Sequence, residues 1–133
     1  MERILLAYDG GDPAKHAADY AAEVAGKFDS KILVLVVGEL VESGYGSQVP
    51  VMAAEEYERL AAQVEDRLKS AGVAAESRVV WGPPAPKIVA EAQASDCDLI
   101  VMGHHGGGLR SLLLGSVARQ VIDEAQCSVL VVR

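Results

Sequence analysis

The chain of 133 residues is 50% apolar and carries a formal net charge of −7. This length is typical of one domain with a buried core, so we expect a single domain spanning residues 1–133. Lysine and arginine do not cluster, which argues against nucleic acids and anionic membrane surfaces as partners. No apolar run approaches the ~18 residues of a spanning helix and the first residues do not read as a signal peptide, so we expect a cytoplasmic protein.

Five short segments are predicted to be strands. Four of them are continuous apolar runs rich in β-branched residues, as parallel strands covered on both faces require, and one is more polar. In chain order they are "RILLAY" (3–8), "KILVLVV" (31–37), the more polar "AESRVVW" (75–81), "DLIVMG" (98–103) and "SVLVV" (128–132).

Four helices are predicted between these strands, because apolar residues recur there at helical spacing. Asp12 is expected to cap the first helix, with Pro13 in its first turn, and Gly72 to end the second. The apolar stripes are Ala17, Tyr20, Ala21, Val24, Ala25 and Phe28; Tyr57, Leu60, Ala61, Val64 and Leu68; Ile88, Val89 and Ala92; and Val117, Val121, Ile122 and Ala125. The order β-α-β-α-β-α-β-α-β implies an α/β fold, a doubly wound five-stranded parallel sheet with right-handed crossovers.

Two other features have no chemistry assigned to them. Residues 38–50, "GELVESGYGSQVP", are predicted to form a mobile loop or lid, with a disordered connection as the alternative. Cys97 and Cys127 lack the spacing of a metal or redox motif, so we expect them to be small buried apolar residues.

The ends of the strands are where a ligand is expected, since open doubly wound sheets bind ligands beyond their carboxyl edge. The stretches "AYDGGDP", Val37-Gly38 and "GHHGGG" follow the first, second and fourth strands. Glycines there let backbone N–H groups converge on an anion, and the predicted helix start at Gly115-Ser116 favours phosphate. Two interpretations remain open: a phosphate cradle, or a strand cap and turn in which Ser116 is an ordinary N-cap.

These stretches also resemble a known family. "ILLAYDGGDPAKHAADYAAEVA", "GPPAPKIVAEAQASDCDLIVMGHHG", "LLLGSVARQVI" and "CSVLVVR" are similar to the universal stress protein family and cover nearly the whole chain. The family's ATP-binding members carry Gly, two residues, Gly, nine residues, Gly, then Ser or Thr. Gly103, Gly106 and Gly115-Ser116 match this pattern, except that eight residues separate Gly106 from Gly115, and Gly11 stands where serine is common. The implied fold is flavodoxin- or Rossmann-like, with strand order 3-2-1-4-5.

The resemblance implies that ATP, with ADP or AMP as alternatives, binds together with Mg²⁺ or Mn²⁺ held through the nucleotide. Asp9 would lie near the ribose, the backbone of Ala7 and Tyr8 beside the base, and Val37 in the adenine pocket. Asp9 has an alternative role as a turn residue that bonds its own backbone. The remaining binding residues would be Met102 and, around the phosphates, Gly103, His105, Gly106, Gly115, Ser116 and Val117.

A protein-only metal site is not expected, because His104 and His105 are neighbours without further ligands at suitable spacing. Arg110 is either a phosphate contact or an exposed side chain. The sequence lacks the recognisable parts of an ATPase, so a regulatory nucleotide-binding protein with at most slow turnover is expected. The alternative is an interaction module that binds no nucleotide and functions through its dimer surface.

The last predicted strand suggests how two copies associate. No element follows it to cover the expected sheet edge, and its residues Val129, Leu130, Val131 and Val132 are apolar. Such an edge commonly pairs with its own copy about a two-fold axis, as universal stress proteins often do. We therefore expect a homodimer, with a monomer whose strand is satisfied within its own sheet as the alternative.

Overall fold

The computed structural model describes residues 1–105 and 114–133. Within them a five-stranded sheet has the order β5-β2-β1-β6-β7. The strands are β1 (Arg3–Ala7), β2 (Lys31–Gly38), β5 (Ala75–Trp81), β6 (Leu99–Gly103) and β7 (Ser128–Val132). All four pairings are parallel, which confirms the predicted parallel sheet and its order 3-2-1-4-5.

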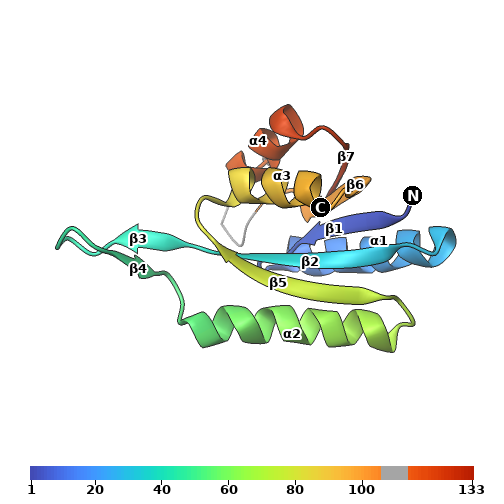
Figure 1. Ribbon diagram of the computed structural model, residues 1–133, viewed down its shortest axis with the longest axis horizontal. Coiled ribbons are helices and arrows are strands. Elements are labelled where there is room, and N and C mark those ends of the chain that lie inside the picture. The colour runs from blue at the N-terminus through green and yellow to red at the C-terminus, as the bar shows by residue number, and fades with distance from the viewer. Residues whose placement is uncertain (106–113) are drawn as a thin grey trace.

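Helices cover both faces of this sheet (Figure 1). They are α1 (Asp12–Phe28), α2 (Ala54–Ser70), α3 (Pro84–Ala94) and α4 (Ser116–Glu124). Successive side chains of a strand point to opposite faces, so Ile4 and Leu6 pack with α1 and α2, whereas Leu5 packs with α3 and α4. Double coverage explains why the strands are continuous apolar runs.

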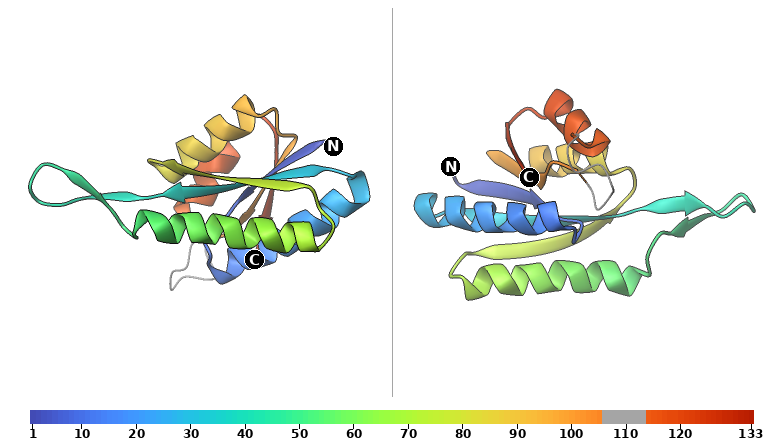
Figure 2. Two further views of the ribbon diagram at one scale, coloured as in Figure 1. Left: turned by 60° about the horizontal axis from the view of Figure 1, so that its bottom comes forward. Right: turned by 180° about the vertical axis from the view of Figure 1, so that it is seen from behind.

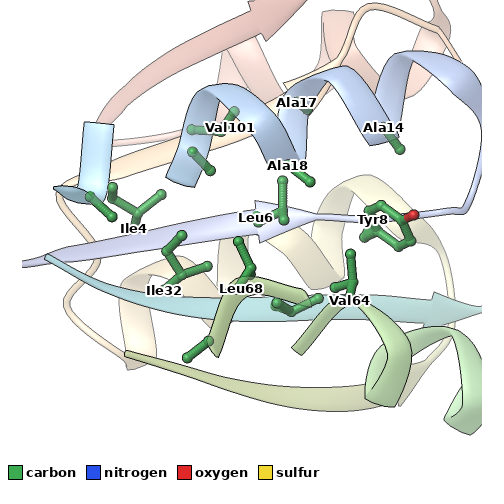
Figure 3. Close-up of a cluster of buried hydrophobic side chains, with 14 of the residues drawn as sticks. Ile4, Leu6, Tyr8, Ala14, Ala17, Ala18, Ile32, Val64, Leu68 and Val101 are labelled. Atoms are coloured by element: carbon green, nitrogen blue, oxygen red, sulfur yellow. The ribbon is translucent and has the colours of Figure 1, made fainter. Parts of the chain in front are cut away.

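The core beneath α1 is built from small helix residues and large strand residues. Ala17 and Ala18 of α1 are buried, as are Ile4 and Leu6 of β1 and Val101 of β6 (Figure 3). Alanines bring the helix close to the sheet, and the branched strand residues fill the remaining space. In the apolar stripe predicted for α1, the alanines are therefore buried, whereas Tyr20 and Phe28 are 51% and 57% exposed.

The start of α1 differs from the prediction that Asp12 is the N-cap. Gly11 is the capping residue, with extended backbone and no side-chain hydrogen bond, and Asp12 is the first helical residue. The reason lies in the turn that precedes the helix. The Asp9 carboxylate accepts a hydrogen bond from the Gly11 N–H there at 2.9 Å and fixes the conformation of this turn. Asp12 then lies in the first helical turn, where a negative charge suits the helix dipole.

Residues 38–50 are not the irregular connection that the sequence predicted. After the end of β2, β3 (Leu40–Glu42) and β4 (Gln48–Pro50) form an antiparallel hairpin that extends away from the sheet and helices in both views of Figure 2. The Ser43 N–H donates to the Ser47 carbonyl at 2.9 Å, and Gly44 and Gly46 adopt positive φ at the tip. Strands of three residues are too short to show a recognisable alternation of apolar and polar side chains in the sequence.

The carboxyl end of β6 packs tightly against the start of α1. A Cβ added at Gly103 would lie 2.7 Å from the Pro13 Cβ and 3.0 Å from the Pro13 carbonyl carbon. Because backbone atoms form part of this contact, a larger residue must push the helix start away from the strand.

None of the helices in the described residues is long and apolar enough to span a membrane.

We predict that Gly103→Ala lowers the free energy of unfolding by about 2 kcal/mol, because the added methyl overpacks this contact. Gly26→Ala is the matched control, since an added Cβ there meets nothing within 4 Å and the site is helical. That control should raise the free energy of unfolding by about 0.5 kcal/mol. Urea denaturation measures both, and equal effects of the two substitutions would contradict the packing described for Gly103.

Candidate functional site

A cavity of about 1030 Å³ opens at the carboxyl ends of β1, β2 and β6. From β1 the chain adds β2 and then β5 on one side of the sheet, and it then adds β6 and β7 on the other side of β1. The cavity thus lies at the switch point of strand order, where doubly wound sheets bind ligands. Among its lining residues are Ala7, Tyr8, Asp9, Val37, Met102, Gly103, His105, Gly115, Ser116 and Val117.

This lining contains each residue that the sequence predicted for the site and that the structure describes. Gly106 and Arg110 lie outside the described residues. The stretches "AYDGGDP", Val37-Gly38 and "GHHGGG" are far apart in the chain, and the parallel sheet brings their beginnings to one edge. The chain therefore gathers short backbone segments and a few side chains around one cavity.

The start of α4 is fixed to the end of β6 through the backbone. The Gly115 N–H donates to the His104 carbonyl at 2.6 Å, and the His104 N–H donates to the Val132 carbonyl at 2.7 Å. A Cβ at Gly115 would lie 3.0 Å from the His105 Cα and 3.3 Å from the His104 oxygen. The glycine is needed because two backbone segments approach each other closely at this point.

The first residues of α4 line the cavity with their backbone. Ser116 is the first helical residue, and Gly115 is the cap without a side-chain bond, so the interpretation of Ser116 as an ordinary N-cap is wrong. The N–H groups in the first turn of a helix have no acceptor within the helix. Together with the positive end of the helix dipole, those of Ser116 and Val117 favour an anion in the adjoining cavity.

Asp9 makes the hydrogen bond to the nearby backbone that is expected of a turn residue. Its Oδ1 accepts from the Gly11 N–H at 2.9 Å across a turn in which Gly10 has a φ of 84°. A Cβ at Gly10 would lie 2.8 Å from Leu60 Cδ2, so the turn is also packed against α2. The turn holds an exposed carboxylate at the cavity, and a turn role and a ligand role are therefore compatible.

The wall beside Asp9 is apolar and partly aromatic. Val37 is half-buried, Leu35 and Met102 are buried, and all three line the cavity. The Tyr8 N–H donates to the Leu35 carbonyl at 3.0 Å, so this amide is already used by the sheet. Burial raises the pKa of the Tyr8 phenol, which the Arg67 charge lowers and the Asp9 charge raises. The net increase keeps the phenol protonated at neutral pH.

The charges around the cavity are mostly negative. In the part of the lining that the structure describes, Asp9 and Glu39 are acidic and neither lysine nor arginine occurs. The buried His104 ring packs edge-on against the His105 ring, with centroids 4.1 Å apart. Among residues 1–105 and 114–133, no group of three His, Cys, Asp or Glu side chains is arranged to hold a metal. An anion in this cavity would therefore depend mainly on backbone donors.

The two cysteines lie away from this cavity, against a second cavity of about 170 Å³. Cys97 is buried and Cys127 is half-buried, and both belong to the core beneath α3 and α4. Burial, followed by the neighbouring Cys127, raises the pKa of the Cys97 thiol to about 11. The thiol is protonated at neutral pH and packs as a small apolar group.

The cavity also has lining residues that sequence reasoning missed. Glu39 and Met52 flank the hairpin and line the cavity. Tyr57 and Leu60 also line it, although their helical spacing predicts only that they face the core. Pro84 of α3 is a further lining residue. Periodicity identifies which helix face is buried, but it does not show that the first turns extend past the end of the sheet and border a cavity.

The fold and site define an α/β protein with a ligand cavity at the switch point of a Rossmann-like sheet. The sequence profile of the universal stress protein family matches residues 1–133, and the chain belongs to this family. It is 38% identical to a universal stress protein of Thermus aquaticus over 100% of this chain and 99% of that one. It is also 34% identical to one of Methanocaldococcus jannaschii, over 99% of this chain and 82% of the relative.

Solved structures of the family have the same fold. A universal stress protein in complex with cAMP has a TM-score of 0.77 and 26% identity, covering 99% of this chain and 97% of that one. One from Archaeoglobus fulgidus in complex with dAMP has a TM-score of 0.73 and 26% identity, covering 100% and 98%. The similarity therefore extends along the whole chain.

Proposed function

We propose that this universal stress protein binds an adenine nucleotide at the switch-point cavity and acts as a regulatory stress-response protein in the cytoplasm. ATP is the proposed ligand, with ADP or AMP as alternatives. The proposal is supported by the strand ends and the start of α4, which bring every predicted binding residue that the structure describes to one cavity. The complexes of two relatives with cAMP and dAMP support an adenine nucleotide as the ligand class.

The proposed pose follows the order of the strands. The phosphates lie at the N–H groups of Ser116 and Val117, beside the end of β6. The ribose lies at the end of β1, where the Asp9 carboxylate accepts from its hydroxyls. The base lies at the end of β2 against Val37, whose side chain offers an apolar wall. The ligand thus extends along the sheet edge from β6 to β2.

A divalent cation is part of the proposal. Asp9 and Glu39 add negative charge to the cavity, and its described lining supplies no lysine or arginine. Mg²⁺ or Mn²⁺ chelated by the phosphates would offset this repulsion, and it is bound through the nucleotide rather than by a protein-only cage. The residues support binding and orientation. We assign them no hydrolytic step.

One sequence observation favours a second candidate, an interaction module that binds no nucleotide. Gly106 and Gly115 are separated by one residue fewer than in the pattern of the ATP-binding members. If the shorter connection misplaces the amides around the phosphates, the surface of the protein alone would carry its function. Direct measurement of nucleotide binding separates the two candidates.

We predict that calorimetry with Mg²⁺ and millimolar ATP detects binding, and that Gly115→Val weakens it at least about tenfold. The added side chain would meet the His104–His105 backbone and displace the start of α4 from the cavity. Gly26→Val is the matched control, because an added Cβ there meets nothing within 4 Å. Absence of heat with the unmodified protein would favour the interaction module, whereas equal weakening by the two substitutions would contradict the placement of the phosphates at the start of α4.

We also propose that the protein is a homodimer joined through β7. Within residues 1–105 and 114–133 this strand lies at the edge of the sheet, as predicted, and pairs with β6 alone. Val129, Leu130 and Val131 remain half-buried and Val132 is buried. The open backbone groups and partly exposed apolar side chains of β7 favour pairing with a second copy about a two-fold axis.

We predict that Val131→Lys converts the dimer into a species sedimenting at the monomer mass of 14.0 kDa. A lysine in the paired strands would place two like charges near the symmetry axis. Val49→Lys is the control, because Val49 is a 41% exposed valine of the hairpin, away from β7. An unmodified protein that sediments as a monomer, or a dimer that tolerates lysine at both Val129 and Val131, would contradict this interface.

A further inference from the structure

The cavity continues past the end of β2, where the proposed ligand places its base. Its lining there includes Val51 and Met52, which follow β4, and Tyr57 of α2. We call this part, lined by Val51, Met52 and Tyr57, the base-end pocket. Figure 1 shows that the hairpin continues from the end of β2 and that the chain passes from β4 into α2, which begins near this end of the sheet. None of these three residues belongs to the predicted nucleotide site.

One wall of the base-end pocket is held in place by packing. Tyr57 is 6% exposed, and its ring packs edge-on against Trp81, with centroids 5.2 Å apart. Its hydroxyl accepts a hydrogen bond from the Glu39 N–H at 3.3 Å. Trp81 in turn lies against Gly38, where a Cβ would come within 2.6 Å of the indole ring. This wall is therefore formed before any ligand arrives.

The rest of the base-end pocket is an apolar rim that is open to water. Val51 and Met52 are 51% and 37% exposed, although both line the cavity. A ligand group that covers them removes apolar surface from water, which favours binding in proportion to the area buried. The base-end pocket thus combines a preformed aromatic wall with apolar surface that a neutral group would cover.

The order of groups in a purine nucleotide matches the order of residues along the sheet edge. From β6 to β2 the cavity presents the start of α4, Asp9 and Val37. The base-end pocket lies next to the end of β2, because the Val51 N–H donates to the Glu39 carbonyl at 2.9 Å and the Glu39 N–H donates to the Tyr57 hydroxyl. In adenine, N6 and C2 are on the side of the ring away from the ribose. A base against Val37 with its ribose at Asp9 therefore directs N6 or C2 toward the base-end pocket.

We propose that the base-end pocket binds an apolar substituent on the adenine ring, so that the ligands include adenine nucleotides with an aromatic or aliphatic group on N6 or C2. This inference rests on the proposed nucleotide binding. Glu39 borders the same end of the cavity, and its carboxylate disfavours an anionic substituent there. The same charge disfavours the reversed pose, in which the phosphates would lie beside Glu39.

The test compares AMP with N6-benzyl-AMP by calorimetry on the unmodified protein and two variants. The benzyl group should tighten binding about tenfold in the unmodified protein through burial of apolar surface. Val51→Asp places a charge on the apolar rim and should reduce the ratio of the two dissociation constants to about one. Val49→Asp should preserve the tenfold ratio, because Val49 is similarly exposed on the same hairpin but is not among the lining residues.

The outcomes separate this inference from the proposed function. If AMP binds and N6-benzyl-AMP binds no more tightly, the base-end pocket is overturned and nucleotide binding stands. A tenfold ratio that survives Val51→Asp also overturns it, because the benzyl group is then buried elsewhere. If neither compound binds, the proposed function fails and the inference fails with it.

Discussion

The close approach of backbone segments at the end of β6 determines both the fold and the candidate site. Gly103 lets the start of α1 pack on the strand, and Gly115 lets the start of α4 reach the His104 carbonyl. The His104 N–H in turn bonds to the end of β7. Helix starts and strand ends thus meet without side chains between them, and the N–H groups of α4 are left facing a cavity.

A site built from backbone explains how an acidic protein can receive an anionic ligand. The chain has a net charge of −7, and the described lining contributes two carboxylates. Helix dipoles and N–H groups supply positive potential that does not appear in any count of charged residues. A metal chelated by the phosphates would supply the remainder.

The fold was predictable from the sequence because strands covered on both faces produce continuous apolar runs, and alternating helices restrict the sheet to parallel order. The positions of Asp9, Val37 and Gly103 followed from the rule that strand ends converge. The hairpin was not predictable, because β3 and β4 have three residues each. The base-end pocket was also not predictable, since Tyr57 has the spacing of a core residue whether or not a cavity lies beside it.

In the proposed site, backbone N–H groups at the strand ends and at the start of α4 bind the nucleotide. Adding Mg²⁺-ATP to ¹⁵N-labelled protein and following the backbone amide chemical shifts tests this arrangement. We expect the largest shifts at Gly103, His105, Ser116 and Val117, with smaller ones at Asp9 and Val37. Saturable shifts confined to other parts of the chain, or no shifts at millimolar nucleotide, would contradict it.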